Sequence, residues 1–172
     1  MCFATVAEFL TARDFNDFYF MINVLFACYF LTGVWFMKPL LKTTKLKIHK
    51  KEAFLAIGFT AIILYIVYGL IYYSIHEFKA YVPAVIGGVS FVAFTGSCFY
   101  ITLFHSHPKK VYLFIVGMCY FVVCMGYIIN ELLVDSNLLI GFINSAEIIA
   151  QFFFVLFLTQ KEEMLSKTEW YI

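Results

Sequence analysis

Five long apolar runs, separated by short polar segments, limit what this chain can fold into. They cover residues 18–37, 53–75, 81–104, 111–134 and 138–158. A transmembrane helix needs about 20 mostly apolar residues at about 1.5 Å each, so every run is long enough for one crossing. Only 13% of the residues are charged and 63% are hydrophobic, too few charges to cover a soluble protein. We therefore predict an all-α integral membrane protein, a bundle of five transmembrane helices.

The basic residues gather on one side of this predicted topology. Ten of the twelve lysine and arginine residues lie in the 38–52 loop, the 105–110 turn and the tail. With five spans, all three segments fall on the same side, and basic loops mark the cytosolic side of a membrane. This predicts an outside N-terminus and a cytosolic C-terminus. Lysines confined to short loops give no sign of a nucleic-acid partner.

The chain divides into three predicted parts. Residues 1–17 form an extracytoplasmic segment, and the spacing of its apolar residues predicts a short interfacial helix. That apolar face comprises Phe3, Val6, Ala7 and Leu10. Residues 18–159 form the transmembrane domain, and residues 160–172 form a cytosolic tail. The expected partner is the lipid bilayer of a bacterial inner membrane or of a eukaryotic internal or plasma membrane.

An acidic residue stands in the middle of the last apolar run. Asn144, Glu147 and Gln151 are spaced i, i+3 and i+7, so they share one side of a helix. A charged side chain at mid-membrane costs about 2.5–3.5 kcal/mol on insertion scales, which makes Glu147 a candidate functional group. No lysine or arginine lies inside any predicted span, and burial favours the neutral acid. A structural hydrogen bond between helices is the alternative interpretation.

Tyrosines follow the helical period in two other runs. Tyr65 and Tyr68 lie in the second run, and Tyr120 and Tyr127 lie in the fourth. If these stripes converge, they line a polar pocket that opens to the outer side, with Glu147 at its floor. Tyrosines also gather at membrane interfaces, and isolated amides hold helices together, so a purely structural role stays open.

Small residues in the third run predict close helix packing. Ala84 and Gly88 are four residues apart, with Gly87 and Ser90 beside them, so a neighbouring helix can approach closely. The five cysteines and four histidines show no spacing typical of a metal or redox site, and no catalytic motif is present. The sequence therefore predicts no metal and no cofactor.

These features favour a small membrane transporter or ligand-binding protein in which Glu147 accepts a proton or a cation. Five helices are few for a transport path, so a homo-oligomer or other membrane subunits are the expected partners. The alternative is a non-catalytic subunit or assembly factor of a larger membrane protein complex. A membrane enzyme acting on lipid is the third interpretation, and it lacks a catalytic pair.

Overall fold

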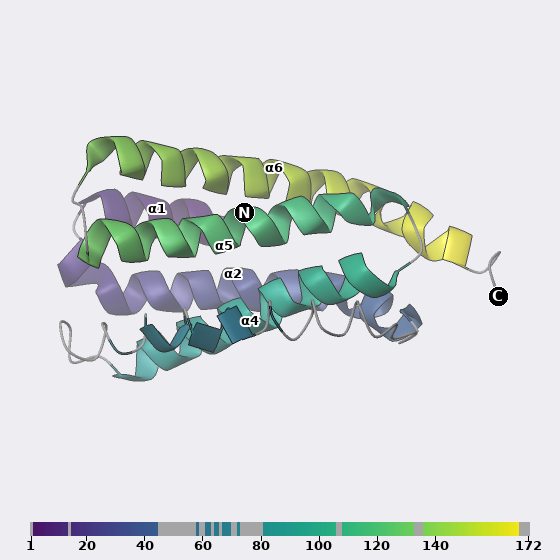
Figure 1. Ribbon diagram of the computed structural model, residues 1–172, viewed down its shortest axis with the longest axis horizontal. Helices are drawn as coiled ribbons and strands as arrows, with labels where there is room; N and C mark the ends of the chain where they lie inside the picture. Colours follow the sequence, from purple (N-terminus) through teal and green to yellow (C-terminus); the bar gives the residue numbers. More distant parts are fainter. Residues whose placement is uncertain are drawn as a thin grey trace.

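The regular structure of the chain is helical throughout the part that is described. The computed structural model describes residues 2–13, 15–44, 81–105, 108–132 and 136–168, and some positions between 58 and 72. Over these residues the chain forms helices and no strand (Figure 1). The elements are α1 (Cys2–Arg13), α2 (Phe15–Thr43), α4 (Tyr81–Phe104), the 3-10 turn η1 (Pro108–Lys110), α5 (Val111–Leu132) and α6 (Asn137–Thr168). The predicted all-α class is confirmed for this part of the chain.

Within the described ranges, three helices are long and apolar enough to cross a membrane. They are Asp17–Thr43 within α2, Val85–Phe104 within α4 and Asn137–Glu163 within α6. These segments match the first, third and fifth apolar runs of the sequence. Their formation follows from the length of each run, because a backbone surrounded by apolar side chains satisfies its own N–H and C=O groups only within a helix.

The described residues do not establish the other two predicted spans. The helix α5 covers most of the 111–134 run, but its described apolar part, Val111–Tyr127, is shorter than the three long segments. The 53–75 run lies largely outside the described residues. Five spans and the orientation relative to a membrane therefore stay predictions.

The helices α2, α4 and α6 run in one direction, and α5 runs in the opposite direction (Figure 1). The helix α5 packs against α6 on one side and α4 on the other, and α2 packs against α4. The first helix, α1, turns back along α2 and buries Ala4 and Ala7, whereas Phe3 and Val6 of the predicted apolar face are about half exposed. Small side chains are the ones buried on α1.

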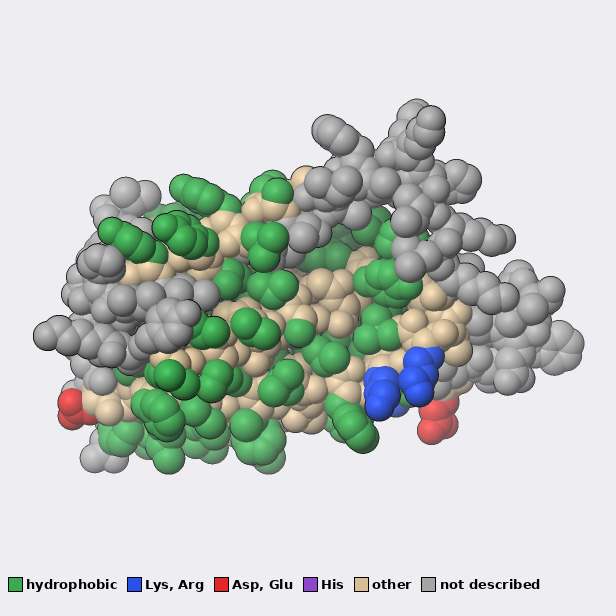
Figure 2. Space-filling view, turned by 90° about the horizontal axis from the view of Figure 1, so that it is seen from below, with side chains coloured by type: hydrophobic (Ala, Val, Ile, Leu, Met, Phe, Trp, Pro, Cys, Tyr) green, Lys and Arg blue, Asp and Glu red, His purple; other side chains and the backbone are tan. Residues whose placement is uncertain are grey.

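The described lysines lie at one end of the bundle. Lys38 and Lys42 belong to the last turns of α2, Lys109 and Lys110 to η1, and Lys161 to the far part of α6. In Figure 2, hydrophobic side chains cover the middle of the face shown, and the charged side chains that it draws lie toward its two ends. This arrangement agrees with the segregation of charge along the sequence.

The helix α6 extends well beyond its apolar run. It continues to Thr168, so part of the predicted tail is helical. Two contacts hold this extension against the bundle: Lys109 forms an ion pair with Glu163, and the ammonium of Lys161 lies 5.7 Å from the ring centre of Phe36. The basic end is thus held by side chains of α2, η1 and α6.

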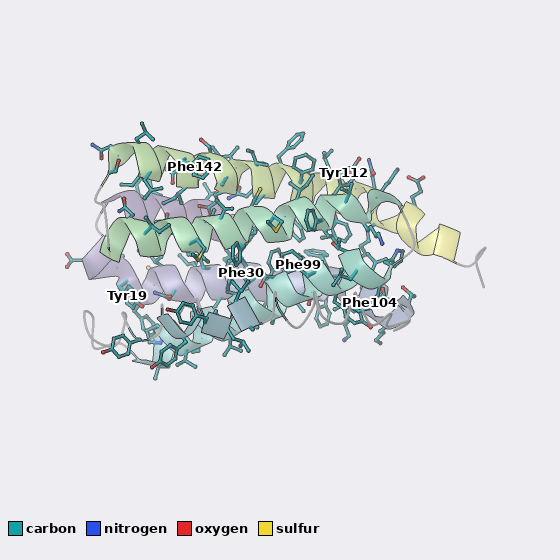
Figure 3. The ribbon with its side chains drawn as sticks, viewed as in Figure 1. Tyr19, Phe30, Phe99, Phe104, Tyr112 and Phe142 are labelled. Atoms are coloured by element: carbon teal, nitrogen blue, oxygen red, sulfur yellow. The ribbon has the colours of Figure 1, made fainter. Side chains whose placement is uncertain are left out.

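An aromatic cluster fills the centre of the bundle. It consists of Tyr29 and Phe30 of α2, Phe94 of α4, Tyr120 of α5 and Phe154 of α6, all buried. Phe30 points from α2 into the space between α2 and α5 (Figure 3). Its ring centre lies 5.3 Å from that of Phe94 and 5.4 Å from that of Tyr120. Each such pair contributes about 0.5–1.5 kcal/mol beyond the area it buries.

Glycines allow two helix pairs to approach closely. A Cβ atom added at Gly33 of α2 would overlap the ring of Phe94, and one added at Gly126 of α5 would lie 2.5 Å from Cγ1 of Ile143 on α6. Interiors are packed too tightly to absorb such overlaps without shifting a neighbour. These glycines therefore set the distances of α2 to α4 and of α5 to α6.

We expect Gly33→Ala to lower the free energy of unfolding by about 1–3 kcal/mol, because the added methyl group forces the ring of Phe94 to move. The matched control is Gly96→Ala on α4, where an added Cβ meets no atom within 4 Å. Alanine is favoured over glycine in a helix by about 1 kcal/mol, so the control should be as stable as the native chain or more so. Unfolding in mixed micelles, followed by circular dichroism, measures both. Equal stability of the two variants would contradict the close contact of α2 and α4.

Candidate functional site

The three polar residues of α6 do not share one environment. Glu147 is 4% exposed, whereas Asn144 is exposed and Gln151 is half-buried. On a helix, Asn144 lies about 60° and Gln151 about 40° around the axis from Glu147. Glu147 stands at the edge of the buried side, and the surface begins between it and Asn144. The predicted polar face is therefore divided by the packing of α6 against α5.

Glu147 lies in the interface between α5 and α6. Ile143 and Ala146 of α6 pack against Val123 of α5, with Tyr127 partly buried beside them. Cys124 of α5 is close enough to Glu147 to interact with it electrostatically. The small side chain of Ala146 lets α5 approach the helix turn that carries the carboxyl group.

Tyr120 of α5 lies in the aromatic cluster. It is 2% exposed, and its hydroxyl group donates a hydrogen bond to the hydroxyl oxygen of Tyr29 at 2.8 Å. Cys124 follows Tyr120 by four residues, so both share one side of α5. Tyr120, Cys124 and Tyr127 thus lie along one side of α5, with Tyr29 hydrogen-bonded to Tyr120 and Glu147 in electrostatic range of Cys124.

Tyr29 was not among the residues predicted from the sequence. It belongs to a run that also contains Tyr19 and several phenylalanines, and its spacing does not distinguish it from them. The same run contains one amide, Asn23. Asn23 is half-buried, and its Nδ2 donates a hydrogen bond to the backbone oxygen of Tyr19 at 2.9 Å.

Tyr65 and Tyr68 do not converge with Glu147. Their side chains are 78% and 66% exposed, and their segment lies on the opposite side of the bundle from α6 (Figure 1). Tyr68 stacks on Tyr72 with ring centres 6.3 Å apart, and Val67 is buried among the described positions of this stretch. The spacing of these tyrosines places them on one face of a helix, but this face points outward. These two residues therefore line no pocket with Glu147.

An open groove of about 440 Å³ lies elsewhere, on the outside of α2 and α4. Its lining residues are Leu41, Val92, Ala93, Gly96, Ser97 and Tyr100. None of these belongs to α5 or α6, so the groove is distinct from the group around Glu147. Its walls are mostly apolar, and Ser97 turns its hydroxyl group back to the oxygen of Ala93 at 2.7 Å.

The small residues of α4 lie where α4 meets α2. A Cβ atom added at Gly87 would lie 2.9 Å from Oδ1 of Asn23. Ser90 is 3% exposed and donates its hydroxyl hydrogen to the oxygen of Ile86, and Gly88 is half-buried. Ala84 belongs to α4, but its side chain is outside the described part. Gly87 is thus in contact range of the half-buried amide on α2.

The sulfur and acidic groups of the described residues form no cluster for a metal ion. Nowhere in the described ranges do three His, Cys, Asp or Glu side chains gather closely enough to hold one. The thiol of Cys98 instead contacts the sulfur of Met37 at 3.8 Å, between α4 and α2. Buried thiols of this kind pack as small apolar groups.

The hydrogen bond between Tyr120 and Tyr29 can be tested by a double-mutant cycle. We expect Tyr29→Phe and Tyr120→Phe each to lower the free energy of unfolding by about 0.5–1.5 kcal/mol. The double variant should lose less than the sum, because the second change breaks no further bond between the two rings. Tyr65→Phe, at an exposed position, is the control and should have no measurable effect. Additive losses would show that the two hydroxyl groups do not interact.

Comparison with known proteins assigns no function to the polar group around Glu147 or to the aromatic cluster. No protein-family model, curated protein or solved structure matches the chain. Conclusions about function therefore rest on the described residues.

Proposed function

We propose that the chain is a polytopic membrane protein with its basic end in the cytosol and its N-terminus on the outer side. The support is the length and apolar character of Asp17–Thr43, Val85–Phe104 and Asn137–Glu163, with the lysines at one end of the bundle. The 53–75 run supplies a further crossing, and α5 crosses as the fourth of five spans. Large apolar side chains such as Trp35 and Phe20, which are 69% and 64% exposed, then face lipid.

We further propose that Glu147 is the proton- or cation-accepting group of a transporter-like or ligand-binding protein. One observation carries this proposal: Glu147 is a buried carboxylic acid about three turns into a helix long enough to cross a membrane. It follows Asn137 by ten residues, or about 15 Å of helix, which is half of a hydrocarbon core of about 30 Å. An acidic group at this depth is expensive to insert and marks ion and proton pathways in membrane proteins.

The packing on either side of Glu147 supports access from the outer side. Toward the basic end, the rings of Tyr29, Tyr120 and Phe154 are buried, and that of Tyr29 contacts the other two. Toward the other end lies the partly buried Tyr127 on α5. A proton or small cation therefore reaches Glu147 from the outer side, past Tyr127, and the aromatic cluster blocks the way onward in this conformation.

The proposal is tested by Glu147→Gln in vesicles. We expect an infrared pH titration of the native protein to show a carboxyl band that Glu147→Gln removes, because the amide cannot release a proton. In the same vesicles, proton entry that depends on the protein, read by an entrapped pH dye, should fall to the level of protein-free vesicles.

The matched control is Glu162→Gln, on the same helix at an exposed position. It should leave both the titration and proton entry unchanged. Circular dichroism shows whether each variant keeps its helices. If Glu147→Gln has the native titration and native proton entry, Glu147 is a structural group and the proposal is wrong.

A second function is favoured by the aromatic cluster itself. Tyr29, Phe30, Phe94, Tyr120 and Phe154 fill the centre of the described bundle, which suits a solid scaffold better than a conduit. The corresponding proposal is a non-catalytic subunit or assembly factor of a larger membrane complex. Purification in mild detergent followed by native mass spectrometry separates the two functions. A stoichiometric set of other proteins favours the subunit, and the chain alone with a bound small molecule favours the first proposal.

A further inference from the structure

One side of α6 faces away from the rest of the bundle and bears a polar group. We call it the outer face of α6, formed by Leu138, Gly141, Asn144, Ser145, Ile148 and Phe152, all exposed. These residues recur at three- and four-residue intervals, so they form one stripe along the helix. The side chains of Leu138, Ile148 and Phe152 are 84%, 67% and 59% exposed. The stripe is uncharged over its whole length.

Asn144 is the exception in this apolar stripe. No hydrogen bond within the described part of the chain involves its amide group. It follows Asn137 by seven residues, or about 10 Å of helix, which places it inside the hydrocarbon region of the proposed membrane. No water is available there, and each unsatisfied polar group costs several kcal/mol. The amide of Asn144 therefore requires a partner from outside the described part of the chain.

The residues around Asn144 permit a second helix to come close. Gly141 is open, since a Cβ atom added there would meet no atom within 4 Å. Ser145 turns its hydroxyl group back onto its own helix, donating to the oxygen of Gly141 at 2.8 Å. Two small residues four apart leave a shallow surface against which another helix backbone can pack. The amide stands at the edge of this surface.

We propose that a second copy of this chain binds along the outer face of α6, with the two Asn144 amides hydrogen-bonded to each other about a two-fold axis. An amide carries both donors and an acceptor, so it satisfies an identical amide. Two copies inserted in the same orientation hold Asn144 at the same depth, and a two-fold contact places each residue opposite its equivalent. The absence of charge from the stripe leaves nothing to repel an identical surface.

The far end of α6 is compatible with this pairing. Beyond the outer face of α6, at the basic end, Glu162 lies on the same side of the helix, and two copies of it side by side would repel. Helices that pack through small residues cross at about 40° in the right-handed sense. The crossing point is near Gly141, about 30 Å of helix from Glu162, so the two carboxylates separate by well over 10 Å.

The experiment measures association of the full chain in phosphatidylcholine vesicles by energy transfer between donor- and acceptor-labelled copies at several protein-to-lipid ratios. We expect the native chain to associate, and Asn144→Leu and Gly141→Leu to associate about 5- to 30-fold more weakly. Asn144→Gln keeps both hydrogen-bonding groups and should associate nearly as the native chain does. Gly96→Leu on α4 is the matched control for Gly141→Leu, because both glycines are open, and it should have no effect.

Cross-linking tests the geometry of the same contact. Asn144→Cys should give a disulfide-linked dimer under mild oxidation beyond the level that the native cysteines give. Ile149→Cys, exposed but on another side of α6, should not. All of these positions are exposed, and circular dichroism verifies the helix content of each variant.

Three results would overturn the proposal. They are a monomeric native chain at every ratio, unchanged association of Asn144→Leu, or association that appears only when another membrane protein is added. The last result would assign the outer face of α6 to a different protein. Proton titration of Glu147 is a separate measurement, so the two proposals can fail independently.

Discussion

The packing of aromatic rings from α2, α4, α5 and α6 holds the bundle together. In a membrane, apolar side chains gain little by leaving lipid for protein, so helices associate through close packing and hydrogen bonds between them. The contact of Phe94 with Phe30, Tyr120 and Phe154 supplies the packing, and the bond from Tyr120 to Tyr29 supplies a directional link between α5 and α2. Gly33 lies against the ring of Phe94 and leaves room for it.

The same cluster fixes the position of Glu147. Phe154 follows Glu147 by seven residues, so both point to nearly the same side of α6. On α5, Cys124 follows Tyr120 by one helical turn and lies within electrostatic reach of the carboxyl group. The cluster therefore sets the rotation of both helices, and with it the neighbours of the acid. A change in the ring packing would alter the neighbours of the Glu147 carboxyl group even if no ring contacts it directly.

The sequence was sufficient to predict helices and insufficient to predict which way they face. Three membrane-length helices were recognisable because length and apolar character alone specify such a helix. They are Asp17–Thr43, Val85–Phe104 and Asn137–Glu163. A helix that is apolar all round gives no periodic signal of its buried side, because lipid and protein interior are equally apolar. Tyr65 and Tyr68 were therefore predicted to line a pocket if the tyrosine stripes converge, and both are exposed. Tyr29 was missed although it is buried. Asn144 and Glu147 share a sequence signal and differ in burial because the boundary of the α5 contact runs between them.

A rotation of α6 cannot bury Asn144 at little cost. Turning the helix by about 60° would bring the amide to the present position of Glu147. It would also draw Ile143, Ala150 and Phe154, each at most 3% exposed, away from their contacts with α5 and the aromatic cluster. Large buried side chains each stabilise a fold by about 1.5–3 kcal/mol, and their packing is specific to this rotation. Keeping Glu147 and Phe154 inside therefore forces Asn144 outside, where a partner beyond the described part of the chain must satisfy its amide.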